Sequence, residues 1–340
     1  MATNSPHSFS WNDDQALRAM DKLEPFPDIK TICITGGAGF IGSWVLRSLT
    51  LTYPAYHFVC FDSLEYSASM NNLGALDGAP NWSLFRGDVA DETAVTKCFA
   101  EHQVDAVLHF AAQSHVDLSF GAPHAFCRTN LTGTVVLLEA ARRCSVKRFV
   151  HVSTDEVYGE VAPGMPDHRE ADALRPTNPY SGSKAAAEMM VCAYAKSFGL
   201  PVVVVRSNNV YGPNQFPEKI IPKFAILINR RQKVPLYGSG EYTRRYIYAG
   251  DVANAFNFIL HRGEIGETYN IGTADRLSNI EVIGKILAAS ASSAAANAAP
   301  LTVEECIEST PNRPFMDRHY AVDFTRLTAL GWSQKNRIMV

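Results

Sequence analysis

Short apolar runs alternate with helical segments over residues 30–206 of this sequence. The runs are rich in Val, Ile, Phe, Leu and Cys, and the longer segments between them carry apolar residues at helical spacing. Strands that are apolar at nearly every position are buried on both faces, as in a parallel sheet that has helices on each side. The runs are KTICIT (30–35), HFVCFD (57–62), WSLFRGD (82–88), DAVLHFA (105–111), KRFVHVST (147–154) and PVVVVR (201–206). The sequence therefore predicts an α/β fold with a doubly wound parallel sheet.

The alternation becomes irregular after Ser207. Prolines at positions 213, 217, 222 and 235 interrupt the chain there, so the predicted elements are short. We expect a large domain over 30–206, to which a segment near 246–271 returns. A smaller C-terminal lobe is expected from 207–245 and 272–340, and the polar residues 1–29 are expected to form an N-terminal extension.

Composition and charge argue against several classes of protein. A net charge of −3 predicts no basic surface for nucleic acid, and no apolar run approaches the ~18 residues of a membrane helix. The seven cysteines are scattered without a CxxC pair, which argues against a disulfide framework and a structural metal site. The N-terminal residues lack the basic and apolar regions of a signal peptide. We therefore expect a cytoplasmic protein without a metal, a membrane partner or a nucleic-acid partner.

The segment TGGAGFIG (35–42) lies between the first apolar run and the first helical segment. Gly36, Gly39 and Gly42 allow a tight turn and a close approach of backbone N–H groups to a pyrophosphate at the helix N-terminus. A tight strand–helix turn without a ligand is the alternative interpretation. The position directly after the first strand favours dinucleotide binding by a Rossmann-like domain.

Two carboxylates follow predicted strands. Asp62 ends the run 57–62, where a carboxylate can accept both ribose hydroxyls of NAD and would repel the 2′-phosphate of NADP. Asp88 ends the next run, where it can reach the adenine. A strand-end cap for Asp62 and a turn cap for Asp88 are the alternatives. The position of Asp62 favours NAD as the cofactor.

Tyr180 and Lys184 are four residues apart in a predicted helix spanning 178–198, so both side chains lie on one face. A lysine ammonium beside a phenol favours the phenolate, and the positive charge of a bound nicotinamide would add to this effect. Both predict a Tyr180 pKa below its reference value of about 10 and a role as base. Thr154 ends the fifth run, where it can hydrogen-bond a substrate oxygen. Without the glycine-rich turn upstream, a core tyrosine and a solvated lysine would be the simpler interpretation.

Asp155 and Glu156 directly follow Thr154 in VSTDEVYG. Two adjacent carboxylates at the edge of a ligand crevice push one pKa upward, so one can act as an acid while the other acts as a base. A polar loop that caps the strand is the alternative.

Five motifs together resemble one family: TGGAGFIGS, HFAAQSHVD, VSTDEVYG, NPYSGSKAAAE and SNNVYGPNQFPEKIIPKF. They resemble the extended short-chain dehydrogenases/reductases and, more narrowly, the nucleoside-diphosphate-glucose 4,6-dehydratases, from about Lys30 to Trp332. Gln113 and Tyr246 depart from the residues usual in the bacterial dTDP-glucose enzymes. The chain looks closer to the UDP-glucose 4,6-dehydratases of UDP-rhamnose synthesis, which favours UDP-glucose over dTDP-glucose as substrate.

The resemblance implies a tightly bound NAD that is reduced and reoxidised in each turnover. Tyr180, assisted by Lys184 and Thr154, would take the proton of the sugar 4-hydroxyl while C4 loses a hydride to NAD. Glu156 would then remove the C5 proton, Asp155 would protonate the departing 6-hydroxyl, and the hydride would return to C6. The product would be the 4-keto-6-deoxy sugar.

The same resemblance leaves three alternatives. Related 4-epimerases lack the Asp155–Glu156 pair, and related UDP-glucuronate decarboxylases keep the Glu but not the Asp, so the pair disfavours both. A non-catalytic nucleotide-sugar sensor is disfavoured because Thr154, Tyr180 and Lys184 are all present.

Further contacts and a partner are implied by the resemblance. Cofactor contacts are expected from Phe40, Ile41, Val89 and Ala111, in addition to Tyr180 and Lys184. Substrate contacts are expected from Asn209, Lys219, Arg244 and Arg313, since arginine forks suit a diphosphate. His115 is left out of the catalytic set, because a structural histidine is an equally good interpretation. A homodimer that packs through the helices near 123–143 and 178–198 is also implied.

Overall fold

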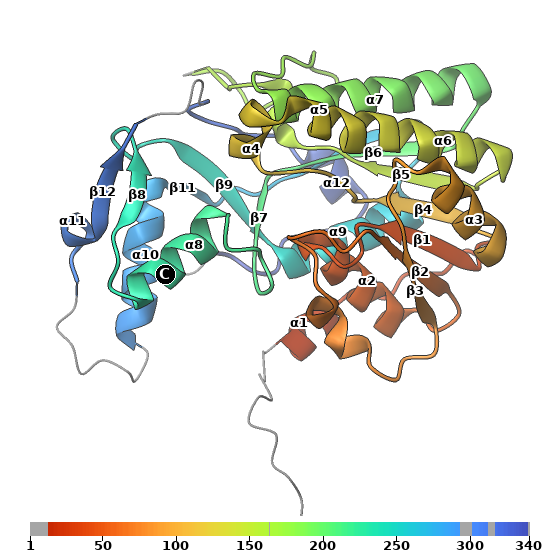
Figure 1. Ribbon diagram of the computed structural model, residues 1–340, viewed down its shortest axis with the longest axis horizontal. Helices are drawn as coiled ribbons and strands as arrows, with labels where there is room; N and C mark the ends of the chain where they lie inside the picture. The colour runs from red at the N-terminus through yellow and green to blue at the C-terminus, as the bar shows by residue number, and fades with distance from the viewer. Residues whose placement is uncertain (1–12, 163, 293–300, 312–316, 339–340) are drawn as a thin grey trace, which may run out of the picture.

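The computed structural model describes residues 13–162, 164–292, 301–311 and 317–338, which form a large α/β body and a smaller lobe (Figure 1). The body is built around a seven-stranded sheet in the order β10-β6-β5-β4-β1-β2-β3. All neighbouring strands are parallel. The strands are β1 (Thr31–Thr35), β2 (His57–Asp62), β3 (Trp82–Arg86), β4 (Ala106–His109), β5 (Arg148–Val152), β6 (Val202–Ser207) and β10 (Thr268–Ile271). The predicted Rossmann-like α/β fold is confirmed.

Helices cover both faces of this sheet, which explains why its strands are apolar at nearly every position (Figure 1). One layer contains α2 (Phe40–Thr52) and α9 (Ala249–Arg262), whose apolar side chains share a core with β1, β2 and β4. The opposite layer contains α3 (Glu92–His102), α6 (Gly133–Arg143) and α7 (Pro179–Phe198). The carboxyl ends of the parallel strands are left free of these layers, at the edge where ligands bind in such folds.

The helix expected near 123–143 is interrupted by a π-helical turn. Its segments are α5 (Pro123–Phe126), η2 (Cys127–Thr132) and α6. Within the turn, the side chain of Asn130 donates to the carbonyl of Gln113 (3.0 Å) and to Oγ of Ser183 (2.9 Å). A π turn places a side chain out of the regular helical register. Here it lets Asn130 connect the loop after β4 to α7.

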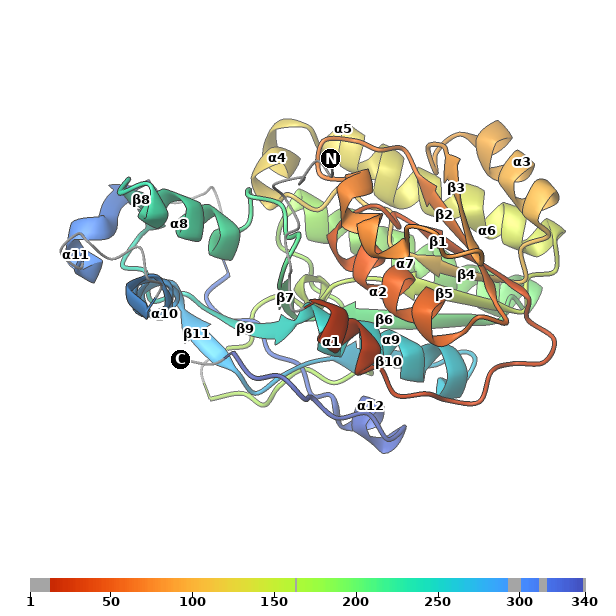
Figure 2. The same cartoon turned by 90° about the horizontal axis from the view of Figure 1, so that it is seen from below.

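The smaller lobe projects from one end of the body (Figure 2). A three-stranded sheet, in the order β11-β9-β7, leads into it, and the lobe also holds the parallel pair β8–β12. Its strands are β7 (Asn209–Tyr211), β8 (Val234–Tyr237), β9 (Thr243–Tyr248), β11 (Arg276–Ser278) and β12 (Ile307–Thr310). Its helices are α8 (Ile220–Asn229), α10 (Asn279–Ser292) and α11 (Val303–Cys306), and they enclose a separate small core.

The segment before β1 lies against the body. Its helix α1 (Asp13–Arg18) packs on α2, and Leu17, Leu23 and Ile29 belong to the same buried cluster as α2 and α9. The backbone N–H of Leu23 donates to Oη of Tyr53 at 2.9 Å. Four short elements complete the fold: η1 (Met70–Leu76), α4 (Val116–Gly121), η3 (Asp155–Tyr158) and α12 (Thr325–Ala329). Within the described ranges, every helix is too short or too polar to span a bilayer.

Candidate functional site

The carboxyl ends of β1, β2, β4 and β5 open into a cavity of about 300 Å³. Most of the residues predicted for the site lie in its wall: Gly36, Gly39, Phe40, Ile41, Gly42, Asp62, Asp88, Val89, Ala111, Thr154, Asp155, Glu156, Tyr180, Asn209 and Lys219. They come from loops that are far apart in the sequence. The parallel register brings these loops to one edge of the sheet.

The glycine-rich turn forms a cradle that only glycine can build. Gly36 has a φ of +68°, and a Cβ there would lie 2.7 Å from the backbone nitrogen of Ala111. A Cβ on Gly42 would lie 2.2 Å from the carbonyl oxygen of Gly36, so α2 can approach β1 only without a side chain at this position. This close approach of backbone to backbone suits a pyrophosphate at the N-terminus of α2.

Asp62 ends β2 beside this turn and is 6% exposed. Its Oδ2 accepts a hydrogen bond from the backbone N–H of Ala38 at 2.9 Å, and its Oδ1 accepts one from Leu64 at 2.8 Å. Burial raises the pKa of Asp62 and these backbone donors lower it. The carboxylate therefore braces the turn and also lines the cavity, where a ribose can reach it.

Asp88 follows β3, caps the turn there and also lines the cavity. Its Oδ1 accepts from the backbone N–H of Ala90 at 2.9 Å, which caps the turn. Its Oδ2 lies 2.7 Å from Nη1 of Arg128, and the residue also lines the cavity together with Val89 and Ala111.

Tyr180 and Lys184 share one face of α7, which begins in a capping box formed by Asn178 and Ser181. Lys184 is 2% exposed, and its Nζ donates to the carbonyl of Val152 at 2.6 Å, which ties α7 to the end of β5. Burial lowers the pKa of Lys184 to about 8.

The expected lowering of the Tyr180 pKa is wrong for the protein by itself. Burial of the phenol raises its pKa, and the nearby charges of Glu156 and Asp155 raise it further. A hydrogen bond with the side chain of Thr154 acts in the opposite direction. The prediction considered the charges of the lysine and of a bound nicotinamide, and it left out burial and the two carboxylates.

Asp155 and Glu156 begin the 3-10 helix η3, for which Thr154 is the N-cap. Asp155 is 3% exposed, and its Oδ2 accepts from Nδ2 of Asn208 at 2.7 Å. Burial raises the pKa of Asp155 to about 7, and the neighbouring charge of Glu156 contributes in the same direction. The expected rise in the pKa of one carboxyl is found at Asp155, but burial is a larger cause than the charge of Glu156.

Glu156 is less enclosed than Asp155 and lines both this cavity and a second one. Its Oε2 accepts from Nδ2 of Asn178 at 3.2 Å. Burial raises the pKa of Glu156 above its ordinary value, although the positive charges of Arg244 and Lys219 act in the opposite direction. The two carboxyls thus differ in surroundings.

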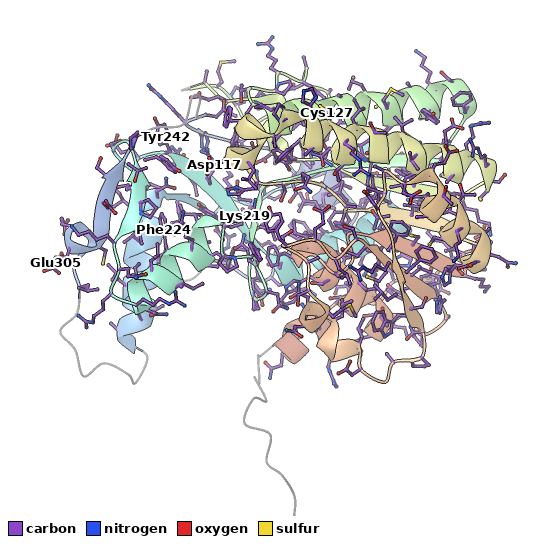
Figure 3. All side chains as sticks on the ribbon, viewed as in Figure 1. Asp117, Cys127, Lys219, Phe224, Tyr242 and Glu305 are labelled. Carbon is purple, nitrogen blue, oxygen red and sulfur yellow. The ribbon has the colours of Figure 1, made fainter. Side chains whose placement is uncertain are left out.

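The second cavity, of about 190 Å³, adjoins the first and extends toward the smaller lobe. The residues that line both cavities are Ser114, Glu156, Asn209, Glu218 and Lys219. Asp117, Lys219, Phe224 and Tyr242 line the second cavity; in Figure 3, Phe224 and Tyr242 lie on the lobe, Asp117 lies on the side of the body, and Lys219 lies between them. A ligand with two parts can therefore extend from the strand ends into the junction with the lobe.

The predicted substrate residues lie around this second cavity. Asn209 at the start of β7 and Lys219 at the N-cap of α8 line both cavities, and Arg244 of β9 lines the second. Nη2 of Arg244 donates to the carbonyl of Asp317 at 3.0 Å, and its guanidinium lies over the ring of Tyr320. Arg313 lies outside the described residues.

Four further polar residues belong to the site although the sequence analysis did not select them: Asn178, Asn208, Asp317 and Tyr320. The sequence contains a signal for Asn178, because an Asn before Pro179 is typical of a helix N-cap, and Asn178 is the N-cap of α7. Asp317 could not, since it meets Thr177 across 140 residues of sequence and no spacing rule connects the two.

Comparison with known proteins agrees with this geometry. The family model described as GDP-mannose 4,6 dehydratase matches residues 33–339. The Arabidopsis thaliana protein RHM1, named as a trifunctional UDP-glucose 4,6-dehydratase, 3,5-epimerase and reductase, is 46% identical over 308 residues. These residues are 90% of this chain and 45% of that protein, so the chain spans less than half of that relative's length.

A Mus musculus relative named dTDP-D-glucose 4,6-dehydratase is 41% identical over 308 residues, covering 90% of this chain and 84% of that protein. Among solved structures, the dTDP-glucose 4,6-dehydratase DesIV of Streptomyces venezuelae, crystallised with NAD, aligns with a TM-score of 0.84 and 34% identity. The alignment covers 91% of this chain and 93% of that one. The match of motifs, fold and nearly the whole described chain leads to one conclusion: this protein belongs to the family described as GDP-mannose 4,6 dehydratase.

Proposed function

We propose that this protein is an NAD-dependent nucleoside-diphosphate-glucose 4,6-dehydratase, which removes water from the hexose and yields the 4-keto-6-deoxy sugar. The observation that carries the proposal is the meeting of Thr154, Asp155, Glu156 and Tyr180 in one cavity wall, with Lys184 buried behind it. An oxidation alone needs the tyrosine and its hydrogen-bond partners. An elimination also needs a base and an acid on the neighbouring carbon atoms, which the two carboxyls can supply.

The residues of the first cavity fit NAD. The glycine cradle accommodates a pyrophosphate, Asp62 lies where the adenosine ribose is expected, and Asp88, Val89, Ala111, Phe40 and Ile41 line the remaining wall. When bound, NAD would accept a hydride from C4 of the sugar and return it to C6. The carboxylate of Asp62 would disfavour the 2′-phosphate of NADP.

The side chains of the protein move the protons. Tyr180 receives the proton of the 4-hydroxyl, and its hydrogen bond with Thr154 favours the charged phenolate that this role requires. Lys184 holds α7 against β5 through the carbonyl of Val152 and keeps Tyr180 at the cavity wall.

The carboxyl pair carries out the elimination. Glu156 removes the C5 proton, which the 4-ketone has made acidic, and Asp155 protonates the departing 6-hydroxyl. The raised pKa of Asp155, about 7, lets this carboxyl hold a proton near neutral pH. The charges of Arg244 and Lys219 favour the ionised form of Glu156, as a base requires. The surroundings of the two groups thus support the division of roles.

The nucleotide is proposed to be UDP. Asn209, Lys219, Arg244 and Arg313 are proposed to bind the nucleoside diphosphate, and the first three line the cavities that continue from the carboxyl pair. Tyr246, one of the departures from the bacterial dTDP-glucose enzymes, lines the second cavity and is 2% exposed. The higher identity to the plant UDP-glucose enzyme than to the mouse dTDP-glucose enzyme supports the same choice.

The wider organisation is proposed on the same basis. The body, residues 30–206 with the segment 246–271, would hold NAD, and residues 207–245 and 272–340 would hold the nucleotide sugar.

A cytoplasmic homodimer is proposed, with α6 and α7 at the interface. Exposed apolar side chains on α7, Met189 and Phe198, support this surface, and the seven free cysteines support a reducing compartment.

The direct test is to incubate the purified protein with NAD and either UDP-glucose or dTDP-glucose and to follow product mass and absorbance at the NADH wavelength. Loss of one water, without net consumption of NAD and faster with UDP-glucose, is the expected result. A galacto product of unchanged mass would instead identify an epimerase, and loss of CO₂ from UDP-glucuronate would identify a decarboxylase. Faster turnover of dTDP-glucose would overturn the choice of nucleotide only.

A further inference from the structure

Two carboxylates from distant parts of the chain are anchored at the N-terminus of α7. Thr177 Oγ1 donates to Oδ2 of Asp317 at 2.6 Å, and the next residue, Asn178, donates through Nδ2 to Oε2 of Glu156 at 3.2 Å. The two acidic side chains are thus anchored by consecutive residues, and both line the second cavity. In agreement, the charge of Asp317 contributes to raising the pKa of Glu156.

Only one oxygen of Asp317 is used by the protein within the described residues. Oδ2 accepts from Thr177 and from the hydroxyl of Tyr320, whereas Oδ1 is buried and has no hydrogen-bond partner in the part of the chain that the structure describes. The residue is 2% exposed and lines the second cavity, as Glu156 does. A buried carboxylate oxygen without a donor is costly, so a donor from a ligand would stabilise it.

We propose that Oδ1 of Asp317 accepts a hydrogen bond from a hexose hydroxyl of the bound nucleotide sugar. This inference rests on the proposed function and extends it to a sugar-binding residue that is separate from the proposed acid–base pair. The hexose, rather than the ribose or the diphosphate, is the ligand part for two reasons. Glu156, which Asp317 neighbours, is the group assigned to C5 of the hexose, and a second negative charge at this position would repel a phosphate. Since C4 and C6 react and C5 bears no free hydroxyl, the 2- or 3-hydroxyl is the donor.

The substitution Asp317→Asn replaces the acceptor Oδ1 by an NH₂ group. In Asp317→Asn, the amide oxygen can still accept from Thr177 and Tyr320, which leaves the NH₂ group in the place of Oδ1. The site then presents a neutral donor, which a hydroxyl can accept, in place of a charged acceptor, while the contacts with the protein are kept. Thr177→Val is the matched control, because it removes a donor to Oδ2 and leaves Oδ1 as it is.

The experiment is calorimetric binding to the full chain loaded with NAD, in a Tyr180→Phe background so that the sugar is not consumed. Asp317→Asn is expected to weaken UDP-glucose about 10-fold, the difference between a hydrogen bond to a charged group and one to a neutral group, and to leave UDP within about 3-fold. Thr177→Val is expected to keep UDP-glucose within about 3-fold of the parent. With UDP-2-deoxyglucose or UDP-3-deoxyglucose, whichever lacks the bound hydroxyl, the parent and Asp317→Asn are expected to bind equally.

Several outcomes would overturn the inference. One is an unchanged affinity of Asp317→Asn for UDP-glucose, and another is an equal loss for UDP. A third is that the difference in affinity between the parent and Asp317→Asn is as large for both deoxy sugars as it is for UDP-glucose. The proposed function is tested separately, with the protein that has its native Tyr180. It fails if this protein removes water from neither UDP-glucose nor dTDP-glucose. If water loss occurs and Asp317→Asn binds as the parent does, only the sugar contact is wrong.

Discussion

Single residues at this site obtain their chemistry from burial more than from their immediate sequence neighbours. Asp155 and Glu156 are adjacent in sequence, yet Asp155 is 3% exposed and hydrogen-bonded to Asn208, while Glu156 reaches the second cavity near Arg244. The two carboxyls therefore have different partners, although burial raises the pKa of both.

The Asp155 carboxyl gives a prediction about pH. Because its pKa is raised to about 7, the proton needed for loss of the 6-hydroxyl is present below that pH and is lost as pH rises through it. The elimination step should slow above pH 7. Asp155→Asn should slow it about 10²- to 10⁴-fold below pH 7, and by a smaller factor above it, while sparing C4 oxidation. Single-turnover NADH absorbance measures the oxidation and product mass measures the loss of water. An equal loss of both steps would refute the separate roles.

Gly42 gives a prediction about the cofactor cradle. A Cβ there would lie 2.2 Å from the carbonyl oxygen of Gly36, so Gly42→Ala must push α2 away from β1. We expect a loss of NAD affinity and a decrease of about 1–3 kcal/mol in the free energy of unfolding. Gly284→Ala in α10 is the control, since its Cβ meets nothing within 4 Å and should stabilise by about 0.5–1 kcal/mol. Calorimetry with NAD and urea unfolding measure both variants, and an undisturbed NAD affinity in Gly42→Ala would contradict the cradle.

At the scale of elements, α7 is fixed to the sheet by a buried ion pair. Glu188, one turn after Lys184, accepts from Nε and Nη2 of Arg206 on β6, and both side chains are almost fully buried. Arg206 also donates to the hydroxyl of Tyr158, the last residue of η3. One cluster therefore sets the position of the helix that carries Tyr180 relative to the short helix that carries the carboxyl pair.

Removal of one partner of this pair is expected to be costly. Glu188→Ala leaves the guanidinium of Arg206 buried without its counter-charge, which should lower the free energy of unfolding by about 3–5 kcal/mol. Glu101→Ala, which breaks the exposed pair with Lys97, is the control and should cost less than about 1 kcal/mol. Urea-unfolding midpoints measure the difference. Similar losses in the two variants would show that burial does not decide the strength of the pair.

At the scale of the whole molecule, the site lies where the body meets the lobe, and the segment before β1 is part of the body's core. Leu17 is fully buried against the layer formed by α2 and α9. Helices α2 and α9 thus pack against residues of the predicted polar extension 1–29.

This support can be measured. Leu17→Ala should lower the free energy of unfolding by about 2–5 kcal/mol because it leaves a cavity between α1 and α2. Leu51→Ala, in the same layer but 41% exposed, is the control and should change it by about 0.5 kcal/mol or less. Urea unfolding with matched m-values would establish the comparison. A loss no larger than that of Leu51→Ala would mean that the segment before β1 packs only loosely.

The sequence by itself determined the Rossmann-like body, the glycine cradle, the strand-end position of Asp62 and the family, because these follow from local periodicity, turn chemistry and contiguous motifs. The tertiary structure decided the direction of the Tyr180 pKa, the π-helical turn at Asn130 and the position of Asp317 beside Glu156. Each of these depends on burial or on a contact between distant segments. Burial and long-range contacts cannot be predicted from the spacing of nearby residues, since both arise only when the layers and the lobe pack together.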